Sequence, residues 1–149
     1  MAEWITPVAN RTQEDVDYAL WQIAEWKKYD FPMVEELKGC LNVSDINRIE
    51  NNIKYLSDKM AEYYYFPHTV TKTWVESDLP DISDINRIIG NIKKMIESYY
   101  QHSLAPEVPD SMIHFEQINS IEKNLALMRI VLTNMINAFE QCGTFECGG

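Results

Sequence analysis

The chain has 149 residues, 46% of them hydrophobic, which is enough to bury one ordinary core. Its 23 acidic residues outnumber 13 Lys and Arg residues, and the formal charge is −10. Such a surface repels phosphate backbones and anionic lipid, so we expect no nucleic acid and no membrane as a partner. No stretch reaches the ~20 apolar residues of a bilayer span, and no secretory signal is legible. We expect a protein kept in a cytosol.

The first predicted helix spans about 12–28. It opens with Thr12-Gln13-Glu14-Asp15, a capping-box-like start, and apolar residues follow at positions 16, 19, 20, 23 and 24. Pro32 sets a limit on its length. A short helix at 33–38 is an additional prediction.

The next two predicted helices, about 44–64 and 83–101, share the signature Ser-Asp-Ile-Asn-Arg-Ile. Residues 44–54 match residues 83–93 at nine of eleven positions, at an offset of 39. Their isoleucines recur in steps of three and four, which places them on one stripe of a helix. We predict Ser44 and Ser83 as the N-caps, because a serine oxygen accepts from a first-turn amide.

The last predicted helix, about 114–140, carries a weaker third copy of the signature. Asn119 matches Asn86, and Asn124 matches Asn91, at an offset of 33. This helix is apolar nearly all round, which is typical of a buried helix. Glu116 stands where the first copies have serine, so Asp110 or Ser111 is expected to start it.

These elements predict an all-α fold: a small bundle of about four main helices built from a repeated motif. The connections at 69–75 and 104–110 are expected to be extended and contain or border prolines. We predict one helical domain at 1–140 and a flexible or partner-ordered tail at 141–149.

No residue pattern points to catalysis, a cofactor or a metal. His68, His102 and His114 share no ligand spacing with one another or with the cysteines, and no glycine-rich phosphate loop occurs. Three cysteines in a reducing cytosol are read as free thiols. We expect a protein that is not an enzyme.

The repeated asparagines allow two interpretations. Asn is a poor helix former, yet it recurs at matching places of the repeats. The amides either contact a ligand or fix packing by hydrogen bonding to loops and neighbouring helices, and we favour the second interpretation. The residues concerned are Asn47, Asn52, Asn86, Asn91, Asn119 and Asn124.

Charged and aromatic residues on the helices suggest surface roles. Asp45 with Arg48, the matching pair in the second copy, and Glu50 with Lys54 have helical pair spacing and are expected to be exposed. A second set is aromatic and forms a speculative protein–protein interface, because Tyr and Trp are favoured there: Tyr64, Tyr65, Trp74 and Phe145.

Several blocks resemble one group of proteins. They are Asn10–Val16 (NRTQEDV), Leu37–Glu50 (LKGCLNVSDINRIE), Trp74–Pro80, Phe115–Asn119 and Cys142–Gly149. The chain is similar in them to virion structural proteins of tailed phages and prophages from Gram-positive and gut bacteria. These motifs are packing signatures and cover most of the chain.

The resemblance implies a non-catalytic structural or assembly protein of a virion, in the tail, baseplate or fibre apparatus. Its partners would be other virion proteins and copies of itself, and it would be assembled in the bacterial host cytoplasm. The alternative is an acidic adaptor or inhibitor that binds a host protein. An enzyme with a cleft lined by Asn, Tyr and Asp is the third and weakest reading.

Overall fold

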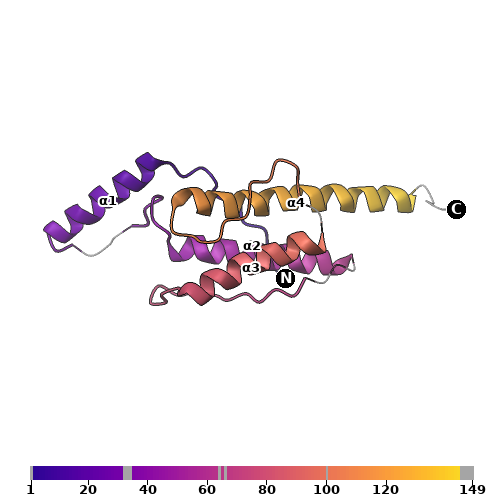
Figure 1. The fold of residues 1–149 in the computed structure, drawn as a ribbon, viewed down its shortest axis with the longest axis horizontal. Helices are drawn as coiled ribbons and strands as arrows, with labels where there is room; N and C mark the ends of the chain where they lie inside the picture. The colour runs from indigo at the N-terminus through magenta and orange to yellow at the C-terminus, as the bar shows by residue number, and fades with distance from the viewer. Residues whose placement is uncertain (1, 32–34, 64, 66, 100, 145–149) are drawn as a thin grey trace.

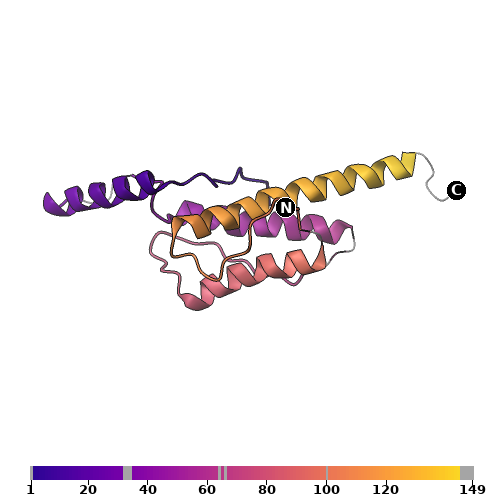
Figure 2. The same cartoon turned by 45° about the horizontal axis from the view of Figure 1, so that its top comes forward.

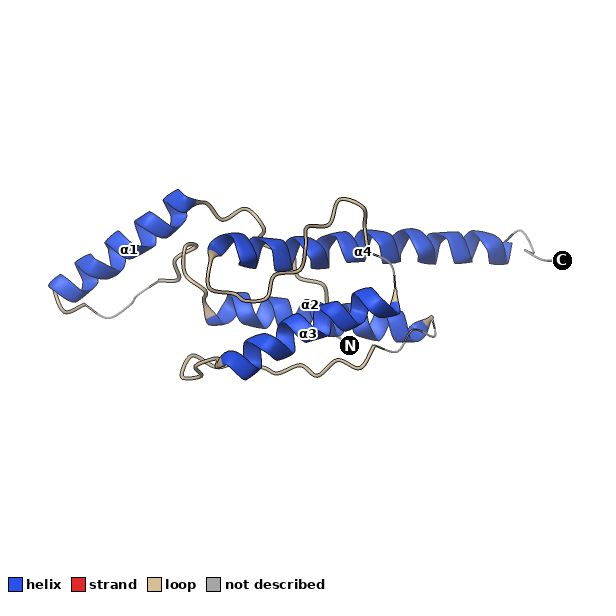
Figure 3. Cartoon of the chain, in the orientation of Figure 1, coloured by secondary structure: helices blue, strands red, loops and turns tan. Residues whose placement is uncertain are grey.

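The chain folds into four helices, as the all-α prediction requires (Figure 3). The computed structural model describes residues 2–31, 35–63, 65, 67–99 and 101–144, with side chains as far as Phe139. No strand occurs in these ranges. The helices are α1 (Gln13–Lys28), α2 (Val43–Glu62), α3 (Ile82–Ser98) and α4 (Phe115–Thr144).

Three of the helices pack together and run in the same direction. α2, α3 and α4 all begin at one end of the molecule and contact one another in all three pairings (Figures 1 and 2). Helices joined by short turns would alternate in direction. Here the chain returns after α2 and again after α3 as an extended segment, so the bundle is parallel within one chain.

Three extended stretches, which we call groove segments, run opposite to the helices. Groove segment 1 is 5–11, groove segment 2 is 70–74 and groove segment 3 is 105–111. Segment 1 bonds to α2 and α4, segment 2 to α2 and α3, and segment 3 to α3 and α4. Each therefore bridges a different pair of helices.

The core lies between α2, α3 and α4 and follows the predicted stripes. Each fully buried aliphatic side chain contributes about 1.5–3 kcal/mol relative to exposure. Residues less than 2% exposed come from all three helices: Ile49, Ile53, Leu56, Met60, Ile88, Ile92, Met95, Ile121 and Leu125.

α1 stands apart from this core. It projects from the end at which the other helices begin (Figures 1 and 2). Its buried residues, Ala19 and Trp26, pack against Leu37 on the chain that returns toward α2. Gly39 permits that return, because a Cβ there would lie 2.1 Å from the Asp15 carbonyl oxygen. The bundle itself therefore has three helices, and the fourth forms an arm.

The predicted cap of α1 is confirmed, but those of α2 and α3 are wrong. Thr12 caps α1 in a complete capping box with Asp15. α3 is capped by Asp81, whose Oδ1 accepts from the Asp84 N–H at 2.9 Å, so Ser83 lies inside the helix. α2 is preceded by Asn42, and Ser44 is likewise helical. In both helices the carboxylate of the third helical residue, Asp45 or Asp84, accepts from the backbone N–H of the N-cap residue, as in a capping box. The nearby serine led the prediction away from this capping box.

Other boundaries also differ from the predictions. Residues 35–38 are not helical, and 32–34 lie outside the described residues, so the short helix at 33–38 is not observed in the part described. α4 begins at Phe115, within one residue of the predicted start at 114, but neither Asp110 nor Ser111 adjoins its first turn, where Gln117 accepts from the His114 N–H at 3.0 Å. It continues to Thr144, past the predicted end at 140.

We expect Asp81→Ala to lower the melting temperature more than Ser44→Ala, whose hydroxyl bonds only to the exposed Glu36 carboxylate. The Ser83 hydroxyl and the Asp84 N–H lower the pKa of Asp81 from 3.8. Because the pKa of Asp81 is lower in the folded chain than in the unfolded chain, the cap stabilises the fold fully at pH values above the unfolded pKa. This stabilisation is lost as the pH falls through the lower pKa of the folded state. Thermal melts at neutral and acidic pH should therefore separate the variants only near neutrality. Equal melting temperatures at neutral pH would contradict this assignment.

Candidate functional site: asparagine clamps and buried ion pairs

Asparagine side chains hold the groove segments by pairing with their backbone. The Asn52 Nδ2 donates to the Ile5 carbonyl oxygen at 2.7 Å, and its Oδ1 accepts from the Ile5 N–H at 3.0 Å. Asn91 makes the same two bonds to Val70, at 2.8 and 3.3 Å. A primary amide has both a donor and an acceptor, so it satisfies one extended residue completely. We call this arrangement a clamp.

A second pair of clamps lies one and a half turns nearer the helix starts. Asn47 pairs with both backbone groups of Trp74, at 2.9 and 2.8 Å. Asn119 pairs with both backbone groups of Arg11, at 2.8 and 3.1 Å. The earlier asparagine thus binds the later segment residue, which fixes the opposite direction of segment and helix.

The last two repeated asparagines depart from this pattern. Asn124 donates to the Pro106 carbonyl oxygen at 2.9 Å. Proline has no N–H, and the Asn124 Oδ1 accepts instead from the Gln101 side chain at 3.2 Å. Asn86 is exposed and makes no hydrogen bond within the described part of the chain. The packing interpretation therefore describes five of the asparagines, whose amide atoms are already occupied, and is wrong for Asn86.

A buried ion cluster joins groove segment 1 to α2 and α4. Arg11, 4% exposed, contacts the Asp45 carboxylate at 2.6 Å and the Glu122 carboxylate at 2.9 Å. Arg48 contacts the same two carboxylates, at 2.7 and 2.5 Å. Burial by itself would lower the pKa of Arg48, but its bonds to Glu122 and Asp45 raise it overall. Two cations and two anions therefore balance inside the seam.

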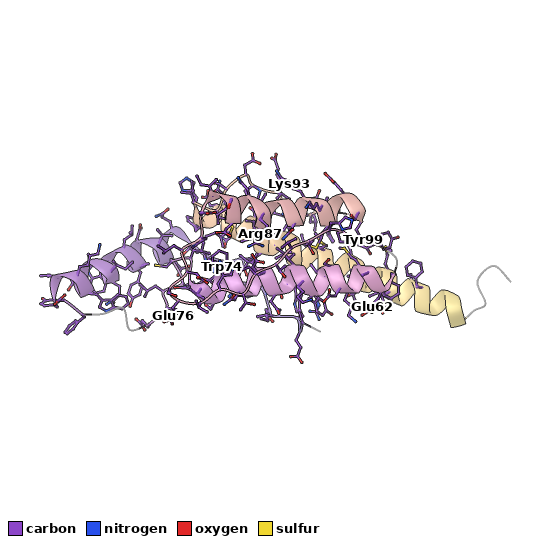
Figure 4. All side chains as sticks on the ribbon, turned by 90° about the horizontal axis from the view of Figure 1, so that it is seen from below. Glu62, Trp74, Glu76, Arg87, Lys93 and Tyr99 are labelled. Atoms are coloured by element: carbon purple, nitrogen blue, oxygen red, sulfur yellow. The ribbon has the colours of Figure 1, made fainter. Side chains whose placement is uncertain are left out.

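The α2–α3 seam contains the corresponding pair. The Arg87 guanidinium bonds to the Glu50 carboxylate at 2.6 Å, beside groove segment 2 (Figure 4). Glu50 is 2% exposed and also accepts from the Lys72 N–H at 2.9 Å. In the repeat, Arg87 is equivalent to Arg48 and Glu50 to Glu122. Each arginine therefore bonds the glutamate of a different repeat.

At the third seam both charges are replaced together. The positions equivalent to this arginine and glutamate are Ser120 on α4 and Ile89 on α3. Ile89 is buried in the core. In two seams the arginine of one repeat bonds the glutamate of the repeat before it in the cycle, and at the third the equivalent residues are uncharged. We call this arrangement the cyclic rule.

The prediction that these charged pairs are exposed is wrong. Asp45 and Glu50 are both buried. Glu50 bonds across the seam rather than to Lys54, which pairs with Asp58 at 3.0 Å. Sequence spacing found the i,i+3 partner of Arg48 but missed Arg11 and Glu122, which come from distant parts of the chain.

The aromatic residues proposed for an interface have different positions. Trp74 is 3% exposed and belongs to the core, so its predicted interface role is wrong. Its Nε1 has no partner among the described atoms. Tyr65 packs edge-on against Tyr99 at 5.3 Å, and burial together with Tyr65 raises the pKa of Tyr99 to about 12. Tyr64 and Phe145 lie outside the described residues.

The surface of the described residues has two hollows, and neither brings together a recognisable set of catalytic or metal-binding side chains. Two hollows of about 340 and 610 Å³ flank the base of α1, lined by residues such as Val16, Phe115, Ile23 and Glu76. Burial, and then Asp45, raise the pKa of Cys40 in the larger hollow, which keeps that thiol protonated. No cluster of three metal-ligating side chains is found over the described ranges.

Comparison with protein-family models, with curated proteins and with solved structures finds no match to this chain. Among the described helices, none combines the length and the apolar character that crossing a membrane requires.

Asn91→Leu should cost about 1–3 kcal/mol of unfolding free energy, because it leaves the Val70 N–H without a partner and removes one of the two donors to the Val70 carbonyl oxygen, the other being Arg87. Asn86→Leu is the matched control at the other asparagine of the same repeat and should cost less than about 0.5 kcal/mol. Chemical denaturation measures both. Similar losses for the two variants would show that the clamp adds nothing.

Arg87→Ser should cost about 3 kcal/mol, because it leaves the buried Glu50 carboxylate without its cation. Glu50→Ile together with Arg87→Ser copies the Ile89–Ser120 seam and should recover roughly 1–3 kcal/mol relative to the sum of the single changes. A double-mutant cycle by denaturant unfolding tests this. Strict additivity would contradict the cyclic rule.

Proposed function

We propose that this chain is a non-catalytic structural or assembly protein of a tailed-phage virion, associated with the tail, baseplate or fibre. It would act through protein–protein interfaces with other virion proteins and with copies of itself. Assembly would take place in the bacterial host cytoplasm. The resemblance of its sequence blocks to virion proteins supports this proposal, and the use of its polar residues agrees with it.

The observation that carries the proposal is that the repeated polar side chains are used within the fold, whereas large apolar side chains are exposed on its surface. The repeated polar residues hold the fold together, because five asparagines clamp backbone and the buried carboxylates pair with arginines. Large apolar residues instead are exposed on the surface, and several of them gather on the projecting arm: Tyr18, Leu20, Trp21, Tyr29 and Phe31. An exposed apolar patch on a protein of this size typically marks a contact with another protein.

A second candidate is an acidic adaptor or inhibitor that binds a host protein. Residues 13–36 support it, since they contain seven acidic residues and two lysines. A basic partner would be attracted to such an arm. A monomer that captures one host protein and never enters particles is the sign of this alternative.

Particles purified from the phage or induced prophage that encodes the chain should contain it in a fixed, repeated copy number. Quantitative mass spectrometry against the major capsid protein measures that number. A host-protein complex recovered from the same lysate provides the comparison for the adaptor reading. Complete absence of the chain from intact particles would contradict the virion proposal.

A further inference from the structure

α1 has a second apolar side that the fold leaves uncovered. One side, with Ala19 and Trp26, packs on the returning chain. The opposite side carries Leu20, Trp21 and Ala24, and the first two are 63% and 57% exposed. A helix that is apolar on both sides normally has a neighbour on both.

Charged residues border this open side in a fixed order. Asp17, Trp21, Ala24 and Lys28 follow one another in steps of four, three and four residues, so they form one stripe along the helix. All four are exposed. The acidic residue is at the start of α1 and the basic residue at its end.

The stripe is complementary to a second copy of itself that runs in the opposite direction. If two α1 helices lie antiparallel about a twofold axis between Gln22 and Ile23, residue 17 faces residue 28 and residue 21 faces residue 24. Asp17 then meets Lys28 of the partner subunit, and the large Trp21 side chain meets the small Ala24 of the partner subunit. Both contacts occur twice, as in any isologous interface. A parallel pair would place like charges together.

We propose that two copies of this chain dimerise through antiparallel packing of their α1 stripes. The occupant of the open side is thus a second copy, selected by charge complementarity and by the pairing of a large with a small side chain. The arm projects beyond the three-helix bundle, so the bundles of the two copies can lie to either side of the contact (Figure 2).

A second strongly exposed apolar site, at Leu79 and Ile82, does not favour self-association. Leu79 and Ile82 are 89% and 80% exposed, but they lie among Asp78, Asp81 and Asp84, of which only Asp84 has a basic neighbour, Arg87 at 3.9 Å. Two copies joined there would place these aspartates against one another. The α1 stripe instead carries one charge of each sign.

Charge reversal and its rescue test the dimer and its direction. Sedimentation equilibrium of the full chain at low salt should show a monomer–dimer equilibrium. Asp17→Lys and Lys28→Asp alone should each raise the dimer Kd about tenfold or more, since each places like charges at two symmetric contacts. The double variant Asp17→Lys with Lys28→Asp should restore the Kd of the original chain to within a few fold.

Leu79→Asp is the control on the other apolar site and should leave the Kd unchanged. Circular dichroism melts establish that each variant is folded, and Ala24→Gln, which keeps the helix, should weaken the dimer by filling the small position. A chain that stays monomeric at all concentrations, or a dimer in which the double variant is not rescued, would overturn the proposal. This dimer is independent of the virion proposal: particles can contain a monomeric chain, and an adaptor can dimerise.

Discussion

The return of the backbone along the bundle is the constraint on which the rest of the structure depends. Three parallel helices in one chain require two return connections, and these connections, like groove segment 1, lie against helices whose own amides are already paired. Buried backbone groups without partners are costly. Asparagine side chains solve this problem, because one amide completes both bonds of an extended residue, as in Asn52 with Ile5 and Asn91 with Val70. The poor helix propensity of asparagine is therefore outweighed by what it does for the segments.

The arginine–glutamate pairs between the helices determine which helix lies beside which. An arginine of one repeat can bond only the glutamate of the repeat placed beside it, so the pairs select one arrangement of three similar helices over its alternatives. The third seam, with Ile89 and Ser120, has no such pair, and groove segment 3 is held instead by Asn124 and by Lys93 with Asp110 (Figure 4 labels Lys93). Buried polar groups commonly set register at some expense of stability. Here they distinguish helices that apolar stripes alone would make interchangeable.

Much of the fold could be predicted from the sequence, because it follows from local periodicity. The steps of three and four residues identified all four helices, and the Thr12 box identified the first start. The N-cap of α3 is two residues earlier than the predicted Ser83, because Ser83 and Asp81 are both good caps and only the Asp84 carboxylate distinguishes them. The bundle of three helices and the arm could not be separated, since α1 is apolar on both sides. The Arg11 cluster joins residues 111 positions apart, and a single sequence carries no local signal for such a pair.

The clamp between Arg11 and Asn119 spans 108 residues, and it ties almost the first ordered segment to the last helix. Synthesis proceeds from the N-terminus, so groove segment 1 leaves the ribosome long before α4 exists. Its backbone groups and the Arg11 guanidinium therefore remain bonded to water until α4 emerges. Long-range contacts of this kind slow folding, because loop closure precedes the stabilising contact. The bundle therefore closes only once α4 has been synthesised, and a truncated product lacking α4 would leave Arg11 and Arg48 without the Glu122 carboxylate.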